Sequence, residues 1–549
     1  MRFLIAALKT LSLKEKWVLI IAAAVFFISS SLLSFEILKR KTDIVPVAGG
    51  EYTEGMVGQP KFINPVLGSV GESDTALIKL VFDDLLSMAE SYKKSGDNKV
   101  FNIRLKENIF WHDGQPITSD DIIFTIDSIQ NADSNSLNAP ALKSVKAERV
   151  SEKEIKIILQ SPYYFFENIL KELRPMPKHI FGDIPASNFR LSEYNLEPIG
   201  SGPFKFASFD KKRDGFITTY TLTRNENYFN KKPYLDSFIF KFYKNQKELI
   251  ESFNSGTIDG FWGLSGKNIS ALEIRRSLIK AKMPRYYAVF LNPYSTEILK
   301  EKNIRTALDY ATDKKLIIDA VFNGNAIKIN NPVLSWIWQI DENFSDEFSY
   351  EKAGALLESD GWILNNDGIR EKKFKNRESA TLEINLIAPD VEFLKETAEI
   401  IKENWKNIGV KVNVSFLSPE KINEALKTRN YEAVIFGNIF GNNPDLYSFW
   451  HSSEKFYPGL NLAMYENKIV DALIESVRRG IDADNIGRDV KKIKGLFLED
   501  RPAVFLFSPE YFYAFNNNQK IILKDVMFMA EDRFDEVENW HIKTARVFK

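Results

Sequence analysis

Residues 100–130 carry a strand pattern, a turn and a helix pattern in immediate succession. Apolar and polar side chains alternate along residues 101–105, the period of a half-buried β-strand. The triplet His112-Asp113-Gly114 has the composition of a tight turn. Thr118 then precedes Asp121 by three residues, an approximate capping-box spacing, and isoleucines follow at helical intervals. This segment is therefore predicted to form strand, turn and helix, with no obvious catalytic group.

Two longer stretches repeat the strand–helix–strand order. Residues 238–242 alternate, an apolar helical stripe follows at residues 249–253, and the next strand pattern begins at residue 258. In residues 382–414 the helix face recurs at spacings of four and three, Gly409 ends the helix, and alternating valines follow. Strand–helix–strand at this length predicts a parallel pair with a right-handed crossover. The chain is therefore predicted to be an α/β protein.

One uncharged apolar stretch lies near the N-terminus, at residues 17–35. Nineteen helical residues span about 28 Å, close to the hydrocarbon thickness of a bilayer of roughly 30 Å. Both flanks are basic, so the positive-inside rule favours a cytoplasmic segment 1–16 only weakly. Three readings stay open: an uncleaved transmembrane anchor, which we expect, a cleaved signal, or a buried core helix.

Composition excludes several classes of protein. Lys plus Arg total 73 and Asp plus Glu 74, which argues against nucleic acid as the main partner. Cysteine is absent, so disulfides, thiolate metal sites and a lipidated cysteine are ruled out. The four histidines are far apart in sequence, and we expect no metal site and no cofactor. The 42 Phe and 20 Tyr residues predict a large core, with the remainder lining a ligand cleft.

Gly200 and Gly202 lie within PIGSGPFKF, at residues 198–206. Taken alone, they suggest a phosphate loop. Pro203 follows directly and removes an amide donor, and no Gly-Lys-Ser/Thr follows. We therefore expect a chain crossing with tight backbone packing at this point.

Several motifs in order resemble the family 5 extracellular solute-binding proteins, the peptide- and nickel-receptor components of ABC importers. The resemblance runs from about residue 51 to about residue 545. It is carried by residues 59–65 (QPKFINP), 100–130, 198–206, 222–236 (LTRNENYFNKKPYLD), 303–326 and 353–362 (AGALLESDGW).

The resemblance implies a two-lobed periplasmic-binding-protein-like α/β fold, of the large cluster C type with an extra subdomain, preceded by one N-terminal transmembrane helix. The two lobes would be joined by two crossings and would close around a ligand. The expected divisions are a cytoplasmic segment 1–16, an anchor or signal 17–35, a linker 36–50, lobe I at 51–73, 200–287 and 513–549, its extra subdomain at 74–199, and lobe II at 288–512.

The resemblance also implies a set of cleft residues. In peptide-binding members an acidic residue near the loop at residues 431–450 holds the ligand's free amine. Asn443 stands where the family has an aspartate, so Asp445 is the nearest acid here. If Asp445 holds the amine, Asp445→Ala would lower affinity for a free-amine ligand by a few kcal/mol. The alternative is a cap or solvated loop residue. The full set of candidates is Asp445, Asn443, Phe440, Gly441, Trp450, Trp262, Trp336, Asn461 and Tyr465.

The predicted function is a membrane-anchored receptor that captures oligopeptides outside the cytoplasmic membrane. Its expected partners are the solute, an ABC permease with its ATPase subunits, and a lipid bilayer at residues 17–35, with a monomeric soluble part. Within the class, an oligosaccharide, an opine-like compound or a nickel chelate are alternatives. A paired-carboxylate hydrolase and a non-transport sensor or chaperone-like protein on the same fold also remain open.

Overall fold

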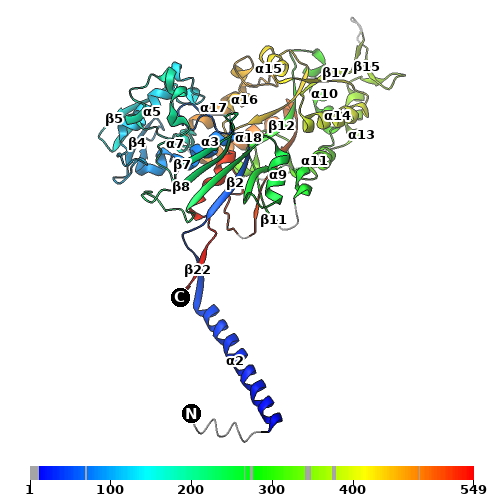
Figure 1. Ribbon diagram of the computed structural model, residues 1–549. Coiled ribbons are helices and arrows are strands. Elements are labelled where there is room, and N and C mark those ends of the chain that lie inside the picture. Colours follow the sequence, from blue (N-terminus) through cyan, green and yellow to red (C-terminus); the bar gives the residue numbers. More distant parts are fainter. Residues whose placement is uncertain are drawn as a thin grey trace.

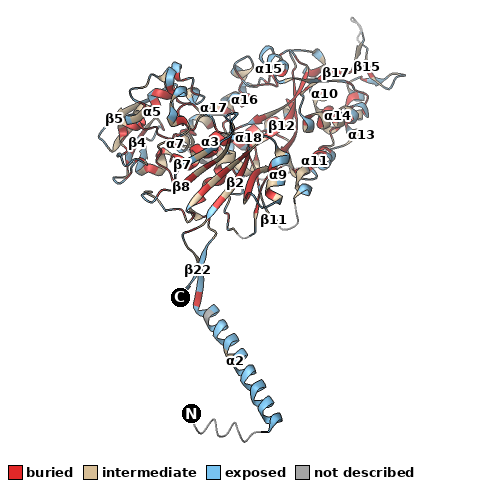
Figure 2. Cartoon of the chain, viewed as in Figure 1, coloured by how far each residue is buried: buried red, intermediate tan, exposed pale blue. Residues whose placement is uncertain are grey.

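The computed structural model describes residues 12–68, 71–264, 266–272, 276–340, 348–373, 379–480, 483–517 and 519–549. Its body consists of two α/β lobes, and a long N-terminal helix projects from it on a narrow stem (Figure 1). Buried positions concentrate in the sheets and helices of the body, whereas the projecting helix is exposed (Figure 2).

Lobe I is built on a seven-stranded mixed sheet. Phe238, Phe240 and Phe242 alternate inward on β9, as their period of two predicts. Strand β2 pairs in parallel with β9 and β10, while the outer pairs are antiparallel. The order is β11 (Arg276–Ala281), β21 (Tyr511–Asn516), β10 (Gly260–Leu264), β2 (Glu51–Val57), β9 (Ser237–Tyr243), β8 (Ile217–Arg224) and β7 (Phe204–Lys211), with α9 (Gln246–Asn254) between β9 and β10.

The extra subdomain has a separate four-stranded antiparallel sheet. The predicted strand, turn and helix are confirmed here: Gly114 has a φ of 89°, and Thr118 and Asp121 form a capping box. The sheet order is β3 (Ala89–Lys94), β4 (Val100–Leu105), β6 (Glu154–Leu159) and β5 (Val145–Arg149), and α5 (Ser119–Gln130) packs on it. Helices α3 (Glu72–Val81), α4 (Leu85–Met88) and α7 (Phe166–Glu172) join it to lobe I.

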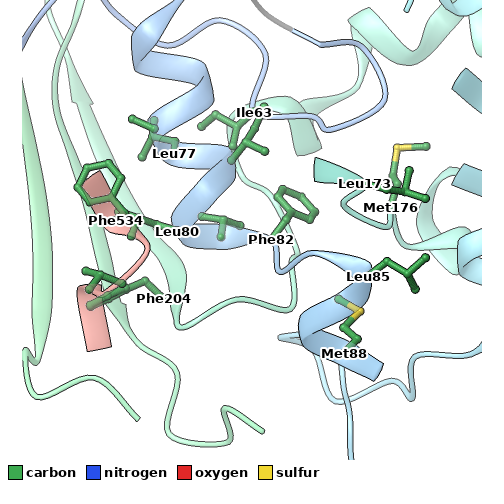
Figure 3. Close-up of a cluster of buried hydrophobic side chains, with 14 of the residues drawn as sticks. Ile63, Leu77, Leu80, Phe82, Leu85, Met88, Leu173, Met176, Phe204 and Phe534 are labelled. Carbon is green, nitrogen blue, oxygen red and sulfur yellow. The ribbon is translucent and has the colours of Figure 1, made fainter. Parts of the chain in front are cut away.

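Apolar side chains continue from lobe I into the subdomain. Phe204 and Phe534 lie beside Leu80 at the end of α3, and Leu85 and Met88 extend the cluster along α4 (Figure 3). One hydrophobic cluster therefore includes both parts, so the subdomain is packed on lobe I rather than tethered to it.

Lobe II has a six-stranded sheet. Strands β17 and β18 are parallel neighbours joined by α14, as the sequence predicts, and Asp313 caps α11 through the amide of Leu316. The order is β13 (Ala326–Lys328), β20 (Ala503–Pro509), β12 (Arg285–Leu291), β19 (Ala433–Ile439), β17 (Glu383–Pro389) and β18 (Lys411–Leu417). The helices are α10 (Lys302–Tyr310), α11 (Lys314–Phe322), α12 (Ser335–Trp338), α13 (Tyr350–Ser359), α14 (Glu392–Lys406), α15 (Pro419–Thr428), α16 (Tyr447–Trp450), α17 (Lys468–Arg479) and α18 (Ala483–Asp500), and a small sheet contains β14 (Ile363–Leu364), β15 (Arg370–Lys372) and β16 (Ala380–Thr381).

The chain passes between the two large sheets twice, from β11 to β12 and from β20 to β21. Arg285 at the first crossing donates to the hydroxyl of Tyr511 at the second, at 3.1 Å, and lies over its ring. Trp262 of β10 stacks on the same ring of Tyr511. The two crossings are thus held side by side, which is the arrangement of a two-stranded hinge.

The PIGSGPFKF segment packs closely against the end of α3. A Cβ at Gly200 would lie 2.0 Å from the carbonyl oxygen of Val81, and one at Gly202 would lie 2.6 Å from that of Leu80. The amides of Ser201 and Gly202 donate to Val81. This is tight backbone packing rather than a phosphate loop, because these amides are already bonded within the chain.

Helix α2 (Leu13–Lys41) includes the whole predicted span 17–35. Among the described residues it is the one helix long and apolar enough to cross a membrane, and it is not packed against the body. Residues 36–50, expected as a linker, comprise the end of α2 and β1 (Thr42–Pro46), which pairs antiparallel with β22 (Thr544–Phe548). Of the expected cytoplasmic segment, residues 1–11 lie outside the described part.

Candidate ligand-binding site

A cavity of about 700 Å³ lies where lobe I, the extra subdomain and a loop of lobe II meet. This volume lies within the usual range of small-molecule sites. Lobe II contributes Asn442, from the loop after β19 that the sequence analysis singled out. The remaining lining comes from α3, α4, α7, the start of β7, the loop after β8 and residues 524–538.

The lining is rich in charges of both signs. Most of them are bound to partners inside the protein: Lys79 and Lys524 pair with Asp535, for example, at 2.5 and 2.7 Å. The charged lining residues are Lys79, Lys171, Arg174, Lys231, Lys524, Asp83, Asp84, Glu172, Asp532, Asp535 and Glu538. A wall of this kind suits a polar or charged solute, because each buried charge requires a compensating partner.

Asp83 is a buried acid on this wall, and its carboxylate is bonded to a tyrosine hydroxyl. It accepts a 2.5 Å hydrogen bond from Tyr228, and its own amide donates to Ser201. Burial and the neighbouring Asp84 raise the pKa of the Asp83 carboxyl to about 6. Asp84 itself caps α4 through the amide of Ser87. Both carboxyls are therefore occupied by internal bonds.

Asp445, the predicted amine-binding acid, already has a cation beside it. Its carboxylate lies 2.9 Å from Nε of Arg478 on α17, and the hydroxyl of Tyr163 donates to it at 3.2 Å. Burial raises the pKa of the Asp445 carboxyl, and Arg478 opposes that shift. The Arg478 guanidinium lies over the rings of Tyr163 and Tyr447. In this arrangement Asp445 joins two parts of the protein, and amine binding by it stays a prediction.

Tyr163 belongs to the extra subdomain, so this cluster bridges the subdomain and lobe II. Its hydroxyl also accepts from the side-chain amide of Asn443. The next residue, Tyr164, donates its amide to the carbonyl of Arg478 at 2.7 Å. Phe165 is 4% exposed and enters the lobe II hydrophobic cluster, where its ring meets Trp338 edge-on. These contacts hold the subdomain against lobe II.

The three predicted tryptophans lie in different places. Trp450 is fully buried in the core of lobe II, where its indole donates to Tyr286 at 3.0 Å. Trp262 is 8% exposed and lies beside the hinge. Trp336 packs against the lobe II cluster, and its buried indole nitrogen has no hydrogen-bond partner among the described residues. None of the three lines the 700 Å³ cavity, and their contact with ligand stays a prediction.

The remaining candidates lie in lobe II. Asn461 is fully buried and exchanges hydrogen bonds with the backbone of Tyr465, whose hydroxyl donates to Asp500. Phe440 packs on Tyr286 and Phe449. Gly441, in the loop with Asn442, has a φ of 57° and lies close to Met529 of lobe I.

Sequence reasoning missed Tyr163, Arg478, Asp83 and Glu172. A signal existed for the first, since SPYYFF at residues 161–166 places four aromatic residues directly after a strand. Glu172 and Arg478 carried no such signal, because each lies on an ordinary helix and acquires its neighbours only through the fold.

Two alternative chemistries were compared with the same site. No group of three or more His, Asp or Glu side chains in the described part of the chain is placed to hold a metal ion. Several carboxylates line the cavity, so the number of acids there does not by itself dismiss a glycosidase-type hydrolase, which needs two of them. Against that role, the adjacent acids Asp83 and Asp84 are both engaged in structural hydrogen bonds.

Two lobes, two crossings and a polar cavity where the lobes meet define the class of two-lobed solute-binding proteins. The chain belongs to the bacterial extracellular solute-binding proteins, family 5, whose model matches residues 86–457. The predicted family and the predicted fold class are thereby confirmed.

Related proteins cover nearly the whole chain. The oligopeptide-binding protein AppA of Bacillus subtilis (strain 168) is 27% identical over 532 residues, which is 91% of this chain and 93% of AppA. Its structure with a nonapeptide covers 90% of this chain and 99% of that one, with a TM-score of 0.68 and 24% identity. The ABC transporter substrate-binding protein CtaP of Listeria monocytogenes has a TM-score of 0.75 at 24% identity, covering 90% and 99%. NikZ of Campylobacter jejuni, in complex with Ni(L-His), has 0.70 at 24%, covering 89% and 99%.

Proposed function

We propose that this protein is a membrane-anchored, extracytoplasmic receptor that captures oligopeptides and delivers them to the permease of an ABC importer. The observation that supports it most is the polar cavity of about 700 Å³ formed jointly by lobe I, its subdomain and Asn442 of lobe II. A ligand in this cavity contacts both lobes, so its binding energy favours the conformation in which the two lobes are closed around it. The protein releases its guest unaltered and is not an enzyme.

The oligopeptide assignment rests on the relative with the most extensive sequence match described above. AppA is called an oligopeptide-binding protein, and its alignment covers 91% of this chain. A cleft of mixed charge and abundant hydrogen-bonding groups suits peptides, because bridging waters allow one site to accept varied side chains. The domain boundaries given in the sequence analysis belong to this proposal.

Mass spectrometry of the solute that co-purifies with the full-length protein in detergent tests the assignment. After mild denaturation, we expect a set of short peptides of varied sequence. A nickel chelate, an oligosaccharide or an opine-like compound as the sole guest would replace the oligopeptide with that alternative. Peptides that are shortened during incubation with the purified protein would refute a binding role and favour the hydrolase.

Anchoring is proposed from α2, whose 29 residues carry Lys39, Arg40 and Lys41 in the last turn. An exposed apolar helix of this length has no partner in the described body, and a bilayer would supply one. Protease treatment of intact cells, after the wall or outer membrane is opened, is expected to digest the body from residue 51 onward. A protected body would place it in the cytoplasm and contradict the proposal.

A further inference from the structure

Glu172 occupies an unfavourable position for a carboxylate. It is the last residue of α7 (Phe166–Glu172) and lines the 700 Å³ cavity. A helix carries partial negative charge at its C-terminal end, so a second negative charge there is destabilised. Lys171 beside it is exposed and pairs instead with Glu167, one turn back, at 3.7 Å.

Glu172 also differs from every other charged side chain on the cavity wall. Each of the others has a hydrogen bond or ion pair within the protein: Lys79, Lys524 and Asp535 with one another, Arg174 with the carbonyl of Phe82, Lys231 with Asn539, Asp83 with Tyr228, Asp84 with Ser87, Asp532 with backbone amides, and Glu538 with Asn539. In the described part of the chain, neither kind of bond reaches the Glu172 carboxylate.

The surroundings keep this carboxyl partly protonated near neutral pH. Burial raises the pKa of Glu172 to about 7; Arg174 and Lys79 oppose the shift from beyond ion-pair distance, and Asp532 and Glu531 add to it. The cavity therefore presents a carboxyl group that becomes a stable anion when a cation arrives.

We propose that Glu172 is the counter-ion for a positively charged group of the solute, so that the cavity selects ligands bearing an ammonium or guanidinium group. This inference rests on the proposed function and names the substrate class of the same site. A charge-assisted hydrogen bond from such a group would give Glu172, the charged wall residue that has no such partner in the described part of the chain, the bond it lacks. The bond also compensates the desolvation of both charges, which a neutral ligand does not achieve.

Isothermal titration calorimetry of the full-length protein in detergent, at pH 8, tests the proposal. The probes are Ala-norleucine-Ala capped at both ends, the same peptide with a free N-terminus, and the capped peptide with lysine in place of norleucine. At least one ammonium-bearing probe is expected to bind tenfold or more tightly than the neutral peptide. In Glu172→Gln this preference disappears, and in the control Glu167→Gln it remains, because Glu167 lies on the same helix but not on the cavity wall.

The outcomes separate this inference from the proposed function. Equal binding of all three peptides by the wild type, or a preference that survives in Glu172→Gln, overturns the role of Glu172 but leaves an oligopeptide receptor. No binding of any peptide, together with no co-purified peptide, overturns both. Thermal unfolding of the ligand-free Glu172→Gln variant is expected to be no easier than that of the wild type, since a half-buried acid without an ion-pair partner in the described part of the chain is removed.

The pH profile gives a second readout. A carboxyl with a pKa of about 7 is mostly protonated at pH 6 and mostly ionised at pH 8. Affinity for the lysine probe, whose ammonium group stays charged over this range, should therefore fall about tenfold from pH 8 to pH 6. Asp83, with a pKa of about 6, titrates in the same cavity. If the fall persists in Glu172→Gln, the titrating group is Asp83 and the proposal is wrong.

Discussion

Removing the Phe165 side chain is expected to weaken the closed arrangement without unfolding either lobe. This ring leaves the extra subdomain and is 4% exposed within the lobe II cluster, next to Trp338. A buried Phe covers roughly 150–250 Å² of surface, worth about 4–6 kcal/mol at 25 cal/mol per Å². Substituting Ala in protein cores costs about 3–5 kcal/mol. Taking about 3 kcal/mol, Phe165→Ala shifts the ratio of closed to open molecules roughly 100-fold toward open.

Single-molecule fluorescence transfer between the subdomain and lobe II measures that ratio. The chain has no cysteine, so cysteines introduced at the exposed positions Lys94 and Lys421 would be labelled specifically. Leu191→Ala, which removes an apolar side chain that is 82% exposed, is the matched control. If Phe165→Ala leaves the distance distribution unchanged and only lowers the melting temperature, the ring stabilises a fixed interface and the reasoning is refuted.

Two further substitutions have defined outcomes. Arg478→Met leaves the buried Asp445 carboxylate without its cation; the cost is about 1–3 kcal/mol, less than for a fully buried pair because the Arg478 side chain is 34% exposed. Burial already raises the pKa of Asp445, and without Arg478 to oppose that shift the pKa rises further above its unfolded value. The variant therefore loses more stability than the wild type as pH rises through that pKa, and the difference disappears at lower pH; melting curves from pH 4 to pH 8 that run parallel to the wild type would contradict this. Gly200→Ala places a Cβ 2.0 Å from the carbonyl oxygen of Val81 and should lower the free energy of unfolding in urea by about 3 kcal/mol. The control Gly96→Ala has open space around the new Cβ and should cost under about 1 kcal/mol. Equal costs for the two variants would show that the backbone at Gly200 adjusts freely.

Local patterns predicted much of the fold because they reflect local physics. The strand, turn and helix around Gly114 and the parallel pair β17–β18 follow from side-chain period, a capping residue and a turn glycine. Strand β2 was harder to place, because it lies between β9 and β10 and its pairing joins residues nearly 200 positions apart. No period in the sequence specifies such a neighbour.

The site was less predictable than the fold for the same reason. Asp445 is predicted as an acid in the loop at residues 431–450, but Arg478 reaches it from a helix 33 positions later, and Tyr163 from 282 positions earlier. Similarly, the sequence does not show that the Trp450 indole donates to Tyr286 inside lobe II, and contact of Trp450 with a ligand stays a prediction. Residue types can be read from the sequence, while the direction in which each side chain points depends on contacts across lobes.

If α2 is a membrane anchor, as proposed, the β1–β22 ribbon sets how far the body can lie from the bilayer. Five residues in each strand extend about 17 Å, and the amide of Lys549 donates to the carbonyl of Lys41 at the last turn of α2. With α2 in the bilayer, this short, doubled stalk keeps the body within a narrow shell above the headgroups. Under the proposed role in import, handover to a permease would then be a search by lateral diffusion in two dimensions, at a high local concentration that a freely diffusing receptor lacks. A bulky fusion attached after Lys549 would sit against the lipid surface and obstruct that encounter.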